Sequence, residues 1–135
     1  MNKEVMLKWI EALKSEDYRQ CKQYLHRGDE FCATGVLCDL HSNQFNNPWI
    51  KEEEYDISYF SYFDRECTIA LEVKEWIGCE FHLSVIMNMN DRGMSFQDIA
   101  TFLEEKLYEY KRDKLFAEAA AGDPGEENEN ELLGL

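Results

Sequence analysis

The segment Phe31–His41 constrains the fold more than any other, because it combines helical spacing of apolar residues with several very small side chains. The apolar face of this helix consists of Ala33, Val36, Leu37 and Leu40. Ala33, Gly35 and Cys38 are small enough to let a neighbouring element approach closely. We therefore predict a central packing helix over 31–41, with a turn at Arg27–Asp29 before it and Asp29 as its N-cap.

Apolar residues that recur every three or four positions predict four further helices. These helices span Asn2–Ser15, Ile69–Ile77, Phe81–Asn90 and Ser95–Ala121. Gly78 is placed to end the second of them, and Ser95 with Asp98 resembles a capping box at the start of the last. A buried strand through 85–87 is the alternative to the helix over 81–90.

The region Trp49–Cys67 is enriched in aromatic and β-branched residues, which favours two short strands or a hairpin around Asp64–Glu66. The Asn-rich segment Ser42–Pro48 before it is predicted as a loop, whereas Tyr18–His26 has no clear pattern. The fold class is therefore predicted as α+β and helix-dominated, with about five helices and a small hairpin. One globular domain spans 1–121, and residues 122–135 form a flexible acidic tail.

The length of 135 residues suits a single domain with a real core. No apolar run of about eighteen residues is present, and the N-terminus lacks the pattern of a secretory signal. We expect a cytoplasmic protein without a membrane partner. Five cysteines in such a compartment are expected to be reduced and mostly buried.

The net charge of −14 restricts the partners of the chain. Six acidic residues and no basic residue lie between Ala117 and Leu135, which leaves −8 on the rest of the chain. Such a surface repels nucleic acid and anionic membranes, so its natural electrostatic partners are basic proteins. The alternative is that the charge only keeps the protein soluble.

Two groups of acidic residues form the candidate partner-binding site. The first group is Glu52, Glu53, Glu54 and Asp56, and the second, along the last helix, is Glu104, Glu105 and Glu109. An array of carboxylates presents dense negative charge to Lys and Arg, as phosphates do, and can therefore occupy a groove that binds nucleic acid. For each group, a merely solvated face is the alternative.

Two Cys-x-x-His pairs raise a zinc hypothesis. Cys38 with His41, and Cys79 with His82, each place a thiolate and an imidazole on one helix face, and together they supply a tetrahedral set. Zinc modules usually hold their ligands in tight Cys-x-x-Cys knuckles, which this sequence lacks. Core packing is the alternative, and we predict no metal or other cofactor.

Cys32 is the candidate for nucleophilic catalysis, because a helix N-terminus lowers the pKa of a thiol. A cysteine hydrolase also needs a positioned His, and no local signature ties His26, His41 or His82 to Cys32. The segment Met89–Glu104 has the spacing of the first part of a helix-turn-helix, but no second turn and recognition helix follow. We expect no direct nucleic-acid binding.

The segment Phe31–Leu40 resembles the central motif of a family of small uncharacterised phage and prophage proteins, Phe-Cys-Cys-Leu-Gly-Val-Leu-Cys-Asp. Three other segments resemble parts of the same family pattern: Trp9–Leu13, Val73–Gly78 and Met89–Phe96. The resemblance covers about Val5 to Lys106. Ala33 replaces the second cysteine of the motif, which weakens any role for adjacent thiols. The resemblance implies a phage origin and carries no activity.

These observations lead to one main hypothesis and two alternatives. The main one is a non-enzymatic phage or prophage accessory protein that binds and inhibits a basic host protein or nucleoprotein complex, such as a defence nuclease, by mimicking nucleic acid. The enzymatic alternative is a small zinc- or cysteine-dependent hydrolase that uses Cys32, Cys38, His41, Cys79 and His82. The third is a phage structural or assembly component.

Overall fold

The computed structural model describes residues 1–78 and 83–120, and this part of the chain folds as predicted into an α+β, helix-dominated domain. Its helices are α1 (Lys3–Lys14), α2 (Ala33–Phe45), α3 (Leu71–Ile77), α4 (Leu83–Asp91) and α5 (Phe96–Ala120). Its strands are β1 (Arg19–Gln20), β2 (His26–Arg27), β3 (Glu30–Phe31), β4 (Ile50–Glu54) and β5 (Ile57–Ser61). The predicted tail at 122–135 lies outside the described residues. Of the helices described, none has the length and apolar character needed to span a membrane.

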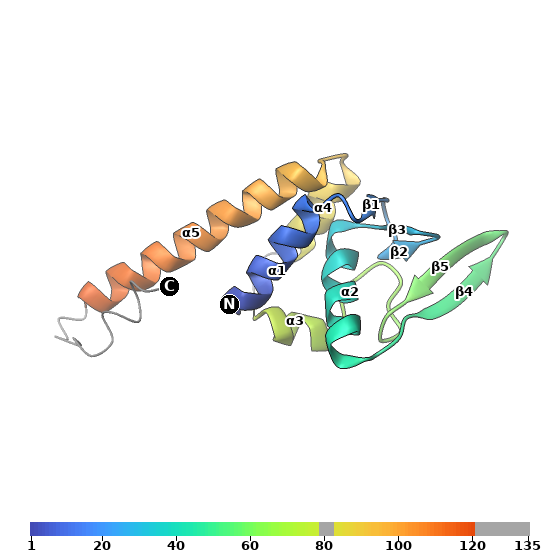
Figure 1. The fold of residues 1–135 in the computed structure, drawn as a ribbon, viewed down its shortest axis with the longest axis horizontal. Coiled ribbons are helices and arrows are strands. Elements are labelled where there is room, and N and C mark those ends of the chain that lie inside the picture. The colour runs from blue at the N-terminus through green and yellow to red at the C-terminus, as the bar shows by residue number, and fades with distance from the viewer. Residues whose placement is uncertain (79–82, 121–135) are drawn as a thin grey trace.

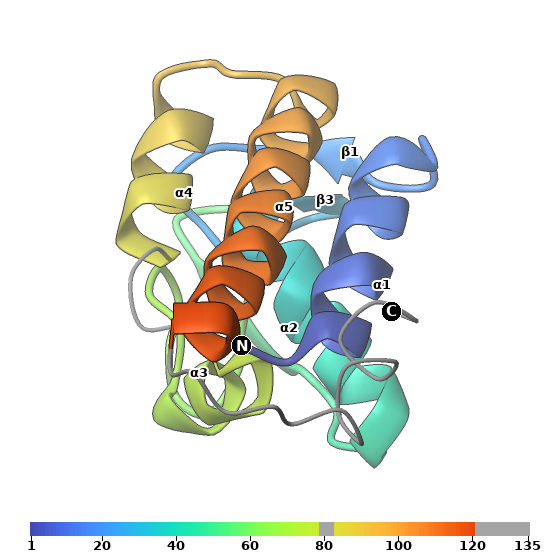
Figure 2. The same ribbon diagram turned by 90° about the vertical axis from the view of Figure 1, so that its left-hand side faces the viewer.

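Helix α2 lies at the centre of the molecule, between the other helices and the sheet (Figure 1). It contacts α1, α3 and α4 on one side and strand β3 on the other. Seen from the side, α5 runs between α1 and α4 and covers this layer (Figure 2). The prediction of a central packing helix is therefore confirmed. Full burial of each large apolar side chain in this core, such as Leu37, contributes about 1.5–3 kcal/mol.

The small residues of α2 allow a close backbone contact. Gly35 packs directly on the carbonyl of Leu25, and a Cβ atom placed on Gly35 would lie only 1.8 Å from that oxygen. The same carbonyl accepts a hydrogen bond of 3.1 Å from the Cys32 backbone N–H. Trp9, which is fully buried, donates from Nε1 to the Ala33 carbonyl at 2.9 Å. The first turn of α2 is thus fixed to both α1 and the segment before β2.

Asn90, at the end of α4, is a buried polar residue that joins three parts of the chain. Its Oδ1 accepts from the Ala33 backbone N–H at 3.0 Å and from Gln20 Nε2 at 2.8 Å. Its Nδ2 donates to the Cys21 carbonyl at 2.8 Å. Because burial of an unpaired amide is costly, these bonds allow Asn90 to occupy a fully buried position and hold α4 against α2.

Both ends of the central helix differ from the prediction. Phe31 belongs to β3, so α2 begins at Ala33, and Cys32 rather than Asp29 is the N-cap. At the other end, the predicted loop over Ser42–Pro48 is wrong, because the helix continues to Phe45. It ends at Asn46, which adopts a left-handed conformation (φ 52°) and donates its N–H to the Ser42 carbonyl. The remaining helices begin or end within two residues of their predicted bounds wherever the structure describes them.

The hairpin exists, but its predicted turn around Asp64–Glu66 is wrong. The turn that joins β4 to β5 is Tyr55–Asp56. A second tight turn, Phe63–Asp64, closes the antiparallel bridge between Tyr62 and Arg65. Neither turn contains the Gly or Asn that marks such turns in a sequence, so the charged run before Tyr55 was not recognised as a strand.

The sheet is larger than predicted and has the order β1-β3-β2-β5-β4. Strand β1 is parallel to β3, and the other neighbours are antiparallel. Strands β1, β2 and β3 have two residues each. Segments this short produce no readable alternation, which explains why the sequence did not predict them.

We predict that Gly35→Ala is strongly destabilising, by about 3 kcal/mol, because the new Cβ collides with rigid backbone. Gly28→Ala is the matched control, since Gly28 has a left-handed φ of 59° but nothing within 4 Å of a Cβ. Its cost is only the backbone term of about 1 kcal/mol. Urea unfolding of both variants measures the difference, and equal costs would show that α2 does not need the close approach.

Candidate functional site

The β4–β5 hairpin extends beyond the rest of the molecule (Figure 1). Its strands pair from Ile50–Ser61 to Glu54–Ile57. Strand β2 pairs with the inner half of β5 only, through His26–Phe60 and Arg27–Tyr59. The outer half of the hairpin, which carries Glu53, Glu54 and Asp56 of the first acidic cluster, therefore lies beyond β2, whereas Glu52 lies opposite Tyr59, where β2 still pairs.

The hairpin tip is conformationally strained. Tyr55 and Asp56 have φ values of 51° and 65°, as a two-residue type I′ turn requires. This region is unfavourable for a bulky L residue, and occupying it costs about 1–3 kcal/mol for each residue. The turn nevertheless carries a tyrosine whose side chain is 89% exposed. Phe63 and Asp64 adopt the same left-handed conformation, so what distinguishes the hairpin tip is the combination of this strain with an almost fully exposed aromatic ring.

Carboxylates occupy both faces of the hairpin beside this turn. Glu52 and Glu54 share the face of Tyr59, whose hydroxyl donates to Glu54 Oε2 at 3.4 Å. Removal of Tyr59 from water raises its phenol pKa, and the negative charges of Glu66, Glu54 and Glu52 raise the pKa further. The negative charges of these glutamates are thus all felt at the Tyr59 hydroxyl. A positively charged group placed on this face of the hairpin would therefore lie near several carboxylates.

The opposite face of the hairpin carries Glu53, which lies 3.5 Å from Lys51 Nζ and accepts from Ser58 Oγ at 3.5 Å. The ion pair is largely exposed to solvent, so its contribution is at most about 1 kcal/mol and it can be exchanged for a pair with a partner. Residues Glu53 to Ser58 line a hollow of about 340 Å³ at the tip. Three of the four acids of the first cluster, Glu53, Glu54 and Asp56, therefore line one hollow at the tip, and Glu52 lies outside it.

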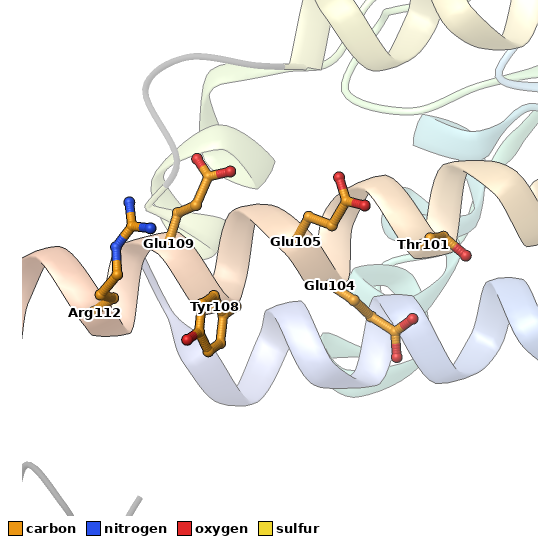
Figure 3. Close-up of a pocket in the computed structure, with 6 residues that line it drawn as sticks. All are labelled: Thr101, Glu104, Glu105, Tyr108, Glu109 and Arg112. Atoms are coloured by element: carbon orange, nitrogen blue, oxygen red, sulfur yellow. The ribbon is translucent and has the colours of Figure 1, made fainter.

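The second cluster lies on the outward face of α5. Glu104, Glu105 and Glu109 line a hollow of about 420 Å³ together with Thr101, Tyr108 and Arg112 (Figure 3). Glu104 contacts Lys14 Nζ at 2.6 Å, and Glu109 contacts Lys106 Nζ at 3.4 Å. Within the described residues Glu105 has no such ion pair. Two of the three predicted contact residues are thus already neutralised by lysines of the same chain.

The seven predicted contact residues do not form one surface. The hairpin lies at one end of the molecule, whereas α5 extends along the opposite side of the helical layer (Figure 1). A single mimic of a nucleic-acid backbone across both clusters is therefore excluded by the distance between them. Of the two acidic clusters, the one on the hairpin is more exposed to solvent.

Of the four candidate zinc ligands from the sequence, the structure describes only Cys38 and His41. Cys38 is completely buried on α2, and His41 Nδ1 is 2.6 Å from the hydroxyl of Tyr62. Cys79 and His82 lie outside the described residues. Among the residues that the structure describes, no three His, Cys, Asp or Glu side chains are grouped so as to hold a metal ion.

The predicted activation of Cys32 is wrong. Its Sγ accepts from the Gly35 backbone N–H at 3.3 Å, so the thiol is near the helix N-terminus as expected. Burial nevertheless raises the pKa of Cys32, and the hydrogen bonds from Thr34 and Gly35 only reduce the increase. Asp29, which had been expected to cap this helix, instead contacts Arg19 at 3.0 Å. The geometry favours a packed thiol over a nucleophile, which would need a lowered pKa.

His26 holds the hairpin to the sheet, a structural role that the sequence does not indicate. Its ring is stacked between Phe31 and Phe60, with centroid distances of 3.9 and 4.1 Å, and Trp49 meets its edge at 4.9 Å. His26, Phe31 and Phe60 come from β2, β3 and β5, and Trp49 directly precedes β4, so only the strand register brings them together. Within the described residues the buried Nδ1 atom of His26 has no hydrogen-bond partner.

Removal from water lowers the pKa of His26, although the negative charge of Asp39 opposes the effect. Burial also lowers the pKa of His41. Because the folded state binds the proton less readily than the unfolded state, stability is complete above the ordinary pKa of about 6.5 and is lost as the pH falls below it. We predict a lower unfolding midpoint in urea at pH 5.5 than at pH 7.5.

His26→Phe should reduce this loss, because it removes one imidazole whose pKa is lowered by burial, together with its unpaired nitrogen, and preserves the aromatic stack. Within the described residues, His41 is the other histidine whose pKa burial lowers, and it contributes to the fall that remains. An identical pH dependence in the variant and the wild type would show that His26 is not involved.

A family model described as "Domain of unknown function (DUF8296)" matches residues 1–107, and the chain therefore belongs to this family. The match covers α1 to α4, the whole sheet and the first half of α5. Comparison with curated proteins and with solved structures gave no match.

Proposed function

We propose that this member of the DUF8296 family is a non-enzymatic phage or prophage accessory protein that binds and inhibits a basic host protein. The target class is a defence nuclease or another nucleic-acid-binding machine. One observation carries the proposal: the β4–β5 hairpin projects an exposed tyrosine, in a strained turn, between carboxylates on both faces.

The chemistry of this tip is complementary to that of a protein site that binds nucleic acid. Such sites are rich in Arg and Lys, which form charge-assisted hydrogen bonds with carboxylates as they do with phosphates. An exposed tyrosine adds an aromatic face for a guanidinium or an apolar anchor at the centre of the contact. The hairpin thereby offers both of the features that dominate binding energy at protein interfaces.

The charge of the whole chain supports the same partner class. A net charge of −14 accelerates encounter with a basic protein and disfavours acidic ones. We assign the main contact to Glu52, Glu53, Glu54 and Asp56, with Tyr55 between them. Glu104 and Glu109 are paired with lysines in ion pairs that are less exposed than that of Glu53 with Lys51, so they contribute less to capture.

Strand β4 is also an edge of the sheet, and edge strands often carry charged residues that prevent unwanted pairing. On that account the glutamates serve solubility, and their position does not affect any partner. The two accounts differ in one respect: binding requires negative charge on the hairpin, whereas charge of either sign on β4 protects the edge.

We predict that the triple variant Glu52→Lys, Glu53→Lys, Glu54→Lys weakens capture of the basic target from host-cell extract by about tenfold or more, corresponding to about 1.4 kcal/mol. Wild-type capture should decrease with salt, and duplex DNA should release the captured protein, because both compete for the same basic groups. Quantitative pull-down followed by mass spectrometry measures each effect.

The matched control reverses three exposed acids elsewhere: Glu11→Lys, Asp17→Lys and Glu75→Lys. It has the same net charge as the hairpin variant, so it should retain capture if position matters. Equal capture by the hairpin variant and the wild type would contradict the proposal, as would target release that is insensitive to DNA.

A further inference from the structure

Helix α5 continues well beyond the body of the protein. Its buried residues are Phe96, Ile99, Ala100, Leu103 and Leu107. No residue from Tyr108 to Ala120 is buried, although this half has a length of about 20 Å at 1.5 Å per residue. Figure 1 shows this end of α5, in orange to red, extending past the other helices. The family match also stops at residue 107, where the packing ends.

The projecting half exposes residues that would be expected in an interface. Tyr108 is 67% exposed and Phe116 is 64% exposed, and Leu115 is also accessible. A helical segment of about a dozen residues is only marginally stable in water without packing. A surface that covers these side chains would therefore stabilise the segment.

The exposed side chains follow the spacing of a coiled-coil seam. Thr101, Glu105, Tyr108, Arg112, Leu115 and Ala119 are separated by alternating steps of four and three residues. This repeat keeps the six side chains on one side of the helix. A second helix packed along it would meet Tyr108, Leu115 and Ala119, and it would meet Glu105 and Arg112 at positions where a coiled coil has apolar residues. Figure 3 shows the first four members of this seam, following one another along α5.

The order of charges along the seam identifies the occupant. Glu104 and Glu105 precede Tyr108, and Lys111 and Arg112 follow it. A second copy of the same helix in the antiparallel direction brings acid against base at both ends. A parallel copy would place like charges together. The seam is thus complementary to itself at its two ends about a two-fold axis near Tyr108, whereas Glu109, which lines the same hollow beside Tyr108, meets its own counterpart near that axis.

We propose that the outward face of α5 is a homodimer interface in which two copies pack antiparallel. Glu105 of each copy faces Arg112 of the other, and the two Tyr108 rings meet near the axis. Glu105 has no ion pair within the described residues, and Arg112 contacts only its neighbour Asp113, at 3.2 Å in an exposed pair. Both groups are available for the new contact at little cost.

This interface is separate from the hairpin, so a dimer presents two acidic tips to its target. Two linked contacts increase the apparent affinity without any new contact at either tip. The dimer does not depend on the proposed function, and its test needs no target protein.

The test is the molar mass of the full-length chain by light scattering after size exclusion, over a range of concentrations. We expect the wild type to approach twice 16.0 kDa. Arg112→Glu and Glu105→Arg should each shift the mass to that of the monomer, because like charges then face each other. The double variant Glu105→Arg, Arg112→Glu restores both pairs with inverted polarity and should recover the dimer.

Arg92→Glu is the control for charge alone, since Arg92 is exposed at the turn after α4 and outside the seam; it should remain dimeric. Circular dichroism confirms that each variant keeps its helical content. A monomeric wild type overturns the proposal, whether the seam is covered by another part of the chain or by solvent. Failure of the double variant to recover the dimer also overturns it.

Discussion

The contact between Gly35 and the carbonyl of Leu25 is the constraint on which the rest of the structure depends. It brings the first turn of α2 against the backbone that leads into β2. Two residues before Gly35, the Ala33 carbonyl accepts a hydrogen bond from Trp9 of α1, and the Ala33 N–H donates to Asn90 of α4. Helices α1, α2 and α4 therefore meet at Ala33. No side chain larger than hydrogen fits at position 35. The sheet can be attached to the helical layer only because that space is left empty.

The hairpin is positioned by this arrangement but does not contribute to it. Leu25 is held by its contact with α2, and His26 is the next residue. Because His26 stacks on Phe60 and pairs with it, β5 is held in a defined position relative to α2. Beyond this stack β2 still pairs with β5 at Arg27–Tyr59, and Gly28 N–H donates to the Ser58 carbonyl at 2.9 Å. Further out, no other strand of the described residues pairs with the hairpin, and its tip carries strain. A rigid base and an exposed, strained end are characteristic of a recognition loop.

The sequence predicts those parts of the fold that depend on local periodicity. The amphipathic spacing of α1 and α5, the small residues of α2 and the glycine after α3 each have a direct local cause, and the structure has them as expected. The features that the sequence did not predict correctly depend on contacts between distant parts of the chain. Cys32 caps α2 because Phe31 is held in a strand, and Tyr55–Asp56 forms a turn because pairing of β4 with β5 requires it. The acidic residues were identified by type, but only the fold shows that they form two separate surfaces.

The central claim is that the hairpin tip is shaped for binding at the expense of stability. The most direct measurement replaces its turn by the preferred type I′ pair, Tyr55→Asn and Asp56→Gly, and compares unfolding in urea with capture of the target. Relief of the left-handed strain should raise stability by about 1 kcal/mol or more, while capture is lost with the tyrosine and the carboxylate. A variant that is more stable and still captures the target would contradict the account.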